Sequence, residues 1–246
     1  VIDRLEADVV RLALDQALSG VPADDLETAM NALREHRHAA ALRVAAAEIG
    51  GLLDPTEPPH ALTELAQVLL SRALALAQAQ VEHRHGRPRA AADPGAEAPL
   101  LVIGYGRLGS AELGYESDLD LVFLHDGAGG ESDGAAPLAN ETWFARAVQR
   151  LTHILTTRTP AGRLYEIDVR LRPSGNAGPL VTTLAGFESY QLTQAWTWEH
   201  QALVRARPVA GDRWFVCLSA RIAVSVRAET LPPELKAHAA QVRGAL

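Results

Sequence analysis

Cysteine, long apolar runs and positive charge are all scarce in this sequence, and each shortage argues against a class of protein. Cys217 is the only cysteine among 246 residues, so an internal disulfide is impossible and a reducing, cytoplasmic setting is expected. No apolar run reaches the roughly 18 residues that a transmembrane helix needs, and the opening stretch VIDRLEADVV is not a signal peptide. The formal net charge of -7 argues against a broad nucleic-acid surface, although a local basic pocket remains compatible with it.

The overall composition is that of a globular protein. With 48% hydrophobic and 22% charged residues, the chain suits one large or two modest domains with a sizeable core. The first residue is Val1 rather than methionine, and the closing stretch LPPELKAHAAQVRGAL resembles a helix cut in mid-course. We therefore expect a piece of a longer protein.

Residues 1–92 are predicted to form a helical region that ends in a linker. This part is rich in Ala, Leu, Arg and Glu, which favour helices. The Pro-, Gly- and Ala-rich stretch 85–99 has the composition of a linker. Two sets of positions follow a helical spacing: Leu5, Val9, Leu12, Ala13 and Gln16 in one, and Leu62, Leu65, Leu69, Ala73 and Leu76 in the other.

Residues 93–212 mix strands with helices. Apolar strands are predicted at 100–106 and 118–126, and a sharply alternating strand at 163–173. Between them Asn140 is predicted to cap a helix, and another helix begins near Thr183. The face of the first helix comprises Trp143, Ala147, Leu151, Ile154 and Leu155. The pattern predicts an α+β fold, a small mixed sheet flanked by helices, with a C-terminal helical segment beginning in residues 213–246.

Two carboxylates stand side by side at the start of the second predicted strand. Alternation places Asp118, Asp120 and Val122 on one face of that strand, and Leu119, Leu121 and Phe123 on the other. Like charges this close repel each other, and a divalent cation such as Mg²⁺ offsets the repulsion while keeping coordination sites for phosphate. If Asp168 of the third strand faces the same way, three carboxylates converge, as a two-metal site for phosphoryl or nucleotidyl transfer requires.

A glycine-rich stretch, GYGRLGSAELG at 104–114, precedes the two aspartates. Gly109 and Ser110 offer backbone N–H groups and a hydroxyl to a phosphate, and Arg107 adds positive charge. The stretch is not a P-loop, because no Gly-Lys-Ser/Thr follows. A dinucleotide-binding fingerprint is also disfavoured, because no acidic residue ends a βαβ unit about 20 residues further on.

The combined pattern, Gly109-Ser110, then Asp118 and Asp120, then Asp168, resembles the nucleotidyltransferase superfamily typified by DNA polymerase β. Three long segments are similar to the bacterial glutamine synthetase adenylyltransferase family: LVIGYGRLGSAELGYESDLDLVFLHD, TRTPAGRLYEIDVRLRPSGNAGPLVT and QAWTWEHQALVRARPVAGD. The similarity is dense over about residues 100–212, which we expect to be the catalytic part of domain 93–212.

The resemblance implies a two-activity enzyme. In that family one domain removes AMP from glutamine synthetase by phosphorolysis, and a second transfers AMP from ATP to a tyrosine of glutamine synthetase. The stretches GYGRLG and AWTWEHQALVRAR are similar to the adenylylating domain, so AMP transfer in nitrogen regulation is the expected function. The removing domain and a catalytically silent regulatory module remain the alternatives. The resemblance also implies the PII signal protein as a partner of the full-length enzyme, and neither nucleic acid nor membrane is expected as a partner.

Residue roles follow from the resemblance by position. It implies that Asp118 and Asp120 bind Mg²⁺, and that Asp168 completes one metal site and helps to activate the tyrosine hydroxyl. Arg107 stands where the family often has Lys, and Ser110 where it often has a second Gly. The candidate residues are Asp118, Asp120 and Asp168 for catalysis and metal binding, and Gly109, Ser110, Arg107, Arg170 and Arg172 for nucleotide binding.

Several other polar and aromatic groups have ordinary explanations. Trp196 and Trp198 either stack on adenine or, as is more usual on an apolar helix, belong to the core. Arg205 and Arg207 either bind phosphates or pair with an acid such as Glu199. The pairs His36 with His38 and His83 with His85 lie on polar segments without nearby ligand residues, so they are predicted to be solvated.

Overall fold

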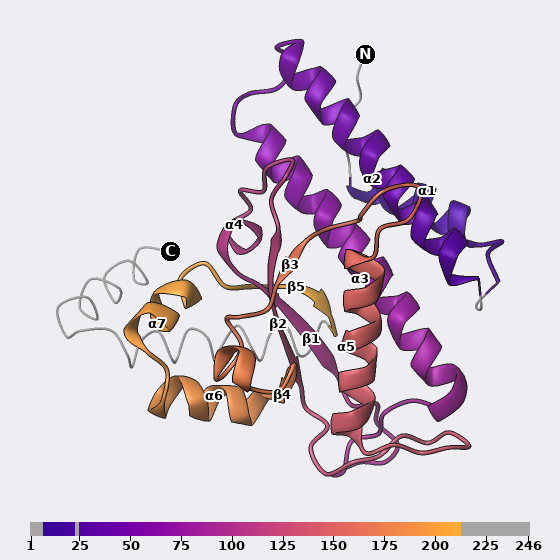
Figure 1. The fold of residues 1–246 in the computed structure, drawn as a ribbon, viewed down its shortest axis with the longest axis vertical. Helices are drawn as coiled ribbons and strands as arrows, with labels where there is room; N and C mark the ends of the chain where they lie inside the picture. Colours follow the sequence, from indigo (N-terminus) through magenta and orange to yellow (C-terminus); the bar gives the residue numbers. More distant parts are fainter. Residues whose placement is uncertain (1–6, 23–24, 213–246) are drawn as a thin grey trace.

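The computed structural model describes residues 7–22 and 25–212 (Figure 1). Its elements are α1 (Ala7–Leu18), α2 (Leu26–Ile49), α3 (Glu57–His85), β1 (Leu100–Gly104), α4 (Gly106–Gly109), β2 (Leu119–His125), α5 (Asn140–Thr156), β3 (Ile167–Asp168), the 3-10 turn η1 (Gly175–Ala177), β4 (Val181–Thr183), α6 (Leu184–Thr193), α7 (Thr197–Leu203) and β5 (Arg207–Gly211). The predicted C-terminal segment 213–246, with Cys217, lies outside the described residues, as does Leu5. Among the helices of the described ranges, none combines the length and hydropathy that a membrane crossing requires.

The first three helices form a bundle against the rest of the core. The α3 positions expected to be apolar are confirmed, because Leu65, Leu69 and Ala73 are buried. The face expected for α1 is wrong. Val10 and Leu14 are buried, whereas Val9 and Leu12 are 53% and 61% exposed. The i, i+4 pair Val10 and Leu14 belongs to the main core cluster with α2 and α3, so tertiary packing selected a stripe one residue away from the predicted one.

A five-stranded mixed sheet lies at the centre of the described chain and confirms the α+β prediction. Its order is β3-β2-β1-β5, with β4 also paired to β2. β1 runs antiparallel to β2 and β5, whereas β3 and β4 run parallel to β2. β3 pairs with the beginning of β2 and β4 with its end, so both lie along the same edge of β2.

Helices cover both faces of this sheet. Leu119, Leu121 and Phe123 of β2 belong to the core cluster that includes α3 and α5. Val122 and Leu124 belong to a second cluster with residues of α6 and α7. Figure 1 shows the resulting layers, with α3 and α5 on one side of the strands and α6 and α7 on the other. The alternation predicted for β2 is thus confirmed, and it assigns Asp118 and Asp120 to the α6–α7 face.

The long third strand predicted at 163–173 is wrong. Only Ile167 and Asp168 pair with β2. The chain then turns, because the Asp168 carboxylate accepts a hydrogen bond from the backbone N–H of Arg170 at 2.8 Å. An aspartate that binds the backbone two residues on offers an alternative to the strand ladder and ends the strand. The alternation fails as well, since the neighbours Leu164 and Tyr165 are both buried.

Helix α5 was predicted correctly, but its capping was not. The side chains Trp143, Ala147, Leu151, Ile154 and Leu155 are all buried, as expected. Asn140 is the first helical residue, and Ala139 occupies the cap position. The Asn140 amide instead donates to the carbonyl oxygens of Arg89 and Gly127, at 2.7 and 2.9 Å, and so joins two loops.

A buried guanidinium fastens α2 to the end of α5. Arg34 is completely buried and donates to four backbone carbonyl oxygens, those of Met30, Ile154, Thr157 and Gly162. Two of these carbonyls, Ile154 and Thr157, lie at the C-terminal end of α5, where helical carbonyls lack partners within the helix. Burial lowers the pKa of Arg34 below its ordinary value. The contact fixes the turn at 159–162 that leads to β3.

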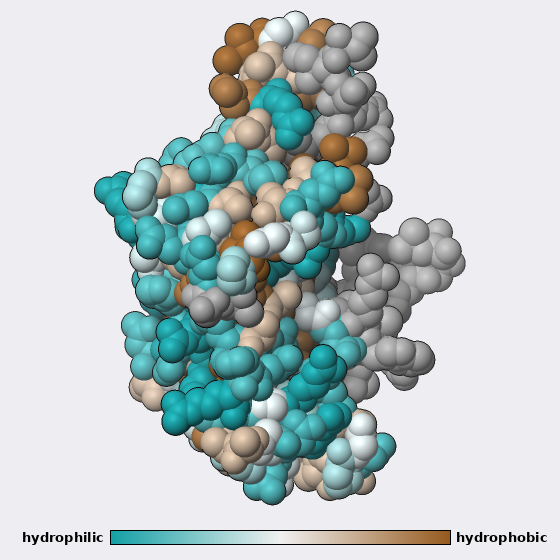
Figure 2. Space-filling view, turned by 90° about the vertical axis from the view of Figure 1, so that its right-hand side faces the viewer, coloured by the Kyte–Doolittle hydropathy of each residue, from teal (hydrophilic) through white to brown (hydrophobic). Residues whose placement is uncertain are grey.

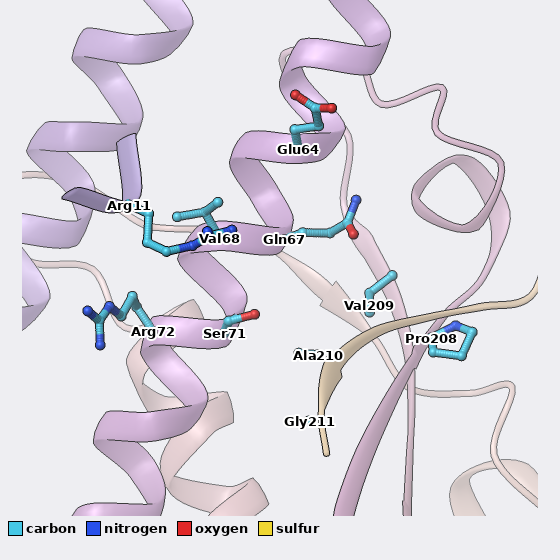
Figure 3. Close-up of a pocket in the computed structure, with 10 residues that line it drawn as sticks. All are labelled: Arg11, Glu64, Gln67, Val68, Ser71, Arg72, Pro208, Val209, Ala210 and Gly211. Carbon is cyan, nitrogen blue, oxygen red and sulfur yellow. The ribbon is translucent and has the colours of Figure 1, made fainter. Parts of the chain in front are cut away.

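Strand β5 was not predicted. Helix α7 ends at Leu203, and residues 207–211 pair with β1. A groove of about 570 Å³ lies between α3 and β5. In Figure 3, Gln67 and Ser71 of α3 lie on the side that faces the strand. None of the candidate site residues lines this groove.

Candidate active site

The site begins where β2 begins. Asp118 is exposed just before the strand, and Asp120 is half-buried within it. The backbone carbonyl of Asp120 accepts a hydrogen bond from the N–H of Tyr105 at 2.9 Å. This contact ties the acidic end of β2 to the start of the glycine-rich loop.

Asp168 lies directly opposite Asp120 on the neighbouring parallel strand. Burial raises the pKa of Asp120 above its ordinary value, the charges of Asp118 and Asp168 raise it further, and Arg170 lowers it. The structure therefore brings the three predicted carboxylates together, and their mutual repulsion is felt most at Asp120.

Arg170 compensates one of these three charges. Its Nε lies 3.0 and 2.8 Å from the two Asp168 carboxylate oxygens, and Nη2 also contacts Oδ2. This ion pair lowers the pKa of Asp168 despite partial burial. Arg172, predicted to share the strand face of Asp168, lies in the turn beyond the strand and donates to the Val169 carbonyl at 2.7 Å. Its charge still contributes to lowering the pKa of Asp168.

The glycine-rich loop forms the short helix α4 between β1 and β2. Gly106 adopts a positive φ of 53°, and a Cβ there would lie 2.3 Å from Asp120 Oδ2. Glycine thus allows the loop backbone to lie against the carboxylate. Gly106 belongs to the glycine-rich stretch that was predicted to hold a phosphate, but it was not among the candidate site residues.

Gly109 is required by packing in this structure. A Cβ at that position would lie 1.6 Å from the carbonyl oxygen of Arg205, which follows α7. The Ser110 hydroxyl lies 2.9 Å from the Gly106 carbonyl oxygen and 3.0 Å from Glu112 Oε2, so it is engaged within the loop. The exposed Arg107 has its Nη1 close to Gly114, on the approach to β2. Their phosphate-binding roles stay predictions.

Of the remaining groups considered in the sequence, the two tryptophans are exposed and Glu199 is hydrogen-bonded. Trp196 and Trp198 are 71% and 55% exposed, so the interpretation as core residues is wrong. Glu199 accepts from the backbone N–H of Trp196 at 2.8 Å and from the Tyr190 hydroxyl at 3.0 Å, rather than pairing with Arg205 or Arg207.

The three clustered carboxylates are oxygen donors of the kind that Mg²⁺ prefers, and one of them, Asp168, pairs with Arg170. Within residues 7–22 and 25–212, no group of three His, Cys, Asp or Glu side chains is arranged to hold a metal ion as it stands. The Asp168 carboxylate is held by Arg170. Carboxylate oxygens in a repelling cluster are the ligands that Mg²⁺ prefers. A site with all three aspartates would therefore require Asp168 to leave Arg170.

Fold and site together define a small nucleotidyltransferase-like domain, with a mixed sheet between helices and paired aspartates at the start of a strand. The sequence model of the family described as glutamate-ammonia ligase adenylyltransferase matches residues 3–218. The chain belongs to this family.

Curated relatives are similar over most of the chain. The identity is 55% over 202 residues to a protein of Thioalkalivibrio sulfidiphilus, 51% over 202 residues to one of Nitrosococcus oceani and 50% over 199 residues to one of Pseudomonas putida. Each relative is named a bifunctional glutamine synthetase adenylyltransferase/adenylyl-removing enzyme. These alignments cover 80–81% of this chain but only 20–21% of the relatives, so the chain spans about a fifth of their length.

Proposed function

We propose that this chain transfers AMP from Mg²⁺-ATP to a tyrosine of glutamine synthetase. The observation that carries the proposal is the register of Asp120 with Asp168 on neighbouring parallel strands, with Asp118 on the same face two positions before Asp120. Such a cluster suits a reaction in which negative charge must be neutralised on a phosphoryl group.

The residues of the chain have distinct parts in this reaction. Asp118 and Asp120 would hold Mg²⁺, with Asp168 completing the set after it leaves Arg170. The bound metal would supply positive charge to the triphosphate and to the leaving pyrophosphate. Arg170, once released from Asp168, has a free guanidinium fork for a phosphate oxygen. Gly109, Ser110, Arg107 and Arg172 are proposed to position the nucleotide.

The attacking group is a tyrosine hydroxyl, whose pKa is about 10 in water. It must lose its proton as the bond to the α-phosphorus forms and the bond to pyrophosphate breaks. We assign Asp168 to orient this hydroxyl and to accept its proton for release to solvent, because it stands opposite Asp120 at the edge of the acidic cluster. Correct positioning of the two reactants would supply much of the rate.

Phosphorolytic removal of AMP from glutamine synthetase is the second candidate. It is favoured by the name of the relatives, which combines both activities. The stretch AWTWEHQALVRAR, which resembles the adenylylating domain, supports transfer rather than removal. Whichever of the two reactions this domain catalyses would use its acidic cluster, so the loss of an aspartate cannot separate the two candidates.

A labelled-nucleotide assay distinguishes the candidates. The 246-residue chain is incubated with α-labelled ATP, Mg²⁺ and unmodified glutamine synthetase, and in parallel with AMP-modified glutamine synthetase and phosphate. Label incorporation that is lost in Asp118→Asn and Asp120→Asn supports transfer. Phosphate-dependent release of AMP would instead identify the removing activity. Binding of glutamine synthetase with neither reaction would indicate a silent regulatory module.

The cellular setting is part of the same proposal. We place the protein in the cytoplasm, with the PII signal protein as a partner of the full-length enzyme. The net charge of -7 supports a protein substrate rather than nucleic acid.

A further inference from the structure

A basic groove of about 480 Å³ lies between the C-terminal half of α3 and the exposed side of α5. Its lining includes three arginines and two histidines, Arg84, Arg146, Arg150, His85 and His153, together with two glutamines. Among the described residues, no acidic side chain lines it. The side of the molecule on which α3 and α5 lie is largely hydrophilic in Figure 2. A concentration of positive charge is unexpected in a chain whose net charge is -7.

The guanidiniums of the groove have no carboxylate partners in the part of the chain that the structure describes. Within the described ranges, no Asp or Glu lies within ion-pairing distance of Arg84, Arg146 or Arg150. By contrast, Arg89, just after α3, pairs with Asp133. In the groove of Figure 3, Glu64 lies among the lining residues, and Arg72 pairs with Asp15. Unlike Arg89 and the groove of Figure 3, the basic groove therefore carries arginine charges that no described carboxylate neutralises.

Helix electrostatics explain only part of this arrangement. Cations are favoured near helix C-termini, which accounts for Arg84 in the last turn of α3. Arg146 and Arg150 lie in the interior of α5, four residues apart on its exposed side. Like charges at this spacing destabilise a helix slightly. A bound anion would convert this repulsion into attraction.

The buried His85 orients Arg146, one of the three arginines of the groove. The prediction that His85 is solvated is therefore wrong. His85 is 8% exposed, and its Nδ1 lies 2.6 Å from the Ala136 carbonyl oxygen. Since that oxygen can only accept, Nδ1 carries the proton and Nε2 is an acceptor. Arg146 Nη1 lies 2.9 Å from Nε2 and donates to it. The Arg146 fork is therefore held in place, with further N–H groups available.

We propose that the groove binds a small phosphorylated ligand carrying two or more negative charges. Planar guanidiniums match phosphate oxygens with paired hydrogen bonds, and three of them suit a multiply charged group. The volume of about 480 Å³ is in the range of small-molecule sites rather than extended polymer surfaces. Since α3 and α5 cover the face of the sheet opposite Asp120, this site is separate from the acidic cluster. It goes beyond the proposed transfer reaction and does not depend on it.

Calorimetric titration of the 246-residue chain with tripolyphosphate tests this proposal. The titration is run in buffer freed of divalent cations on a chelating resin, because without these cations the acidic cluster repels the anion and only the basic groove should bind it. We expect one saturable site, weakened about tenfold or more in Arg146→Gln and in Arg150→Gln, because each removes a charged hydrogen-bonding partner. Arg146→Lys should recover only part of the affinity, since it keeps the charge but loses the fork.

The matched control is Arg43→Gln, which removes the same charge from an exposed position on α2. It should change the affinity less than twofold. Absence of saturable binding, or equal weakening by Arg43→Gln, would overturn the proposal. Equal affinity for citrate would overturn the assignment to phosphate chemistry. Circular dichroism checks that the variants, all at exposed positions, keep the fold.

Discussion

Arg170 holds Asp168 through three parts of one residue: its backbone N–H donates to Oδ1 at 2.8 Å, its Nε lies 2.8 Å from Oδ2, and its Nη2 also reaches Oδ2. The same contact ends β3 and neutralises the third carboxylate of the cluster. Asp168 therefore has a partner in this structure, whereas Asp118 and Asp120 share no such cation.

Substitution of Arg170 tests whether it also serves the nucleotide. Arg170→Gln should raise the KM for ATP about tenfold or more, because a charged hydrogen bond to phosphate is lost. The concentration of Mg²⁺ for half-maximal activity should not rise, because Asp168 is released. Steady-state kinetics at varied ATP and Mg²⁺ measure both quantities. Arg158→Gln, at an exposed arginine beyond α5, is the control, and an unchanged KM in Arg170→Gln would contradict the assignment.

Asp120→Asn should separate stability from activity. The pKa of Asp120 is raised in the folded protein, so above that pKa the ionised carboxylate opposes folding. Its contribution to stability therefore falls as the pH rises through the raised pKa. The variant removes this cost and should stabilise the fold at neutral pH by about 0.5–2 kcal/mol.

Urea unfolding at several pH values measures this difference. The stability gain of Asp120→Asn over the wild type should be present at pH 7 and shrink as the pH falls toward 4. AMP transfer should be lost in the same variant. If the variant is less stable than the wild type at pH 7, the ionised Asp120 carboxylate has stabilising partners in the folded protein and the prediction is wrong.

Gly109→Ala tests the close contact between α4 and the end of α7. The added Cβ would overlap the backbone carbonyl oxygen of Arg205. A backbone atom cannot avoid the overlap by a change of rotamer, as a side chain can. Overpacking of this kind costs about 1–3 kcal/mol. Gly20→Ala, where a Cβ would meet nothing within 4 Å, is the control. Similar unfolding midpoints for the two variants would mean that the loop relaxes freely.

Arg34→Met tests the buried guanidinium that joins α2 to the end of α5. Methionine has similar length but no donors, so the four carbonyl oxygens lose a shared partner. We expect the free energy of unfolding to fall by about 3–5 kcal/mol, as measured by urea denaturation. Arg43→Met, at an exposed site on the same helix, should cost less than about 0.5 kcal/mol. A small loss in Arg34→Met would show that water replaces the guanidinium.

Local pattern in the sequence predicted those parts of the fold that depend on near neighbours. The period of two residues in β2 places Asp118 and Asp120 on one face, and the helical spacing of α5 buries Trp143 and Leu151. The same reasoning failed at β3, because the side chain of Asp168 competes with the strand ladder through a bond to Arg170. It also missed β5, whose partner β1 lies about a hundred positions earlier in the chain.

The sequence by itself determined that this protein carries an acidic pair on a strand after a glycine-rich loop, since spacing alone dictates which side chains share a face. Only the tertiary structure decided which charges meet. It paired Asp168 with Arg170, turned His85 toward Arg146 and left the basic groove without an acid among its described lining residues. His85 and Arg146 are distant in sequence, and Arg170 meets Asp168 only through the turn after β3. Local periodicity does not predict either contact.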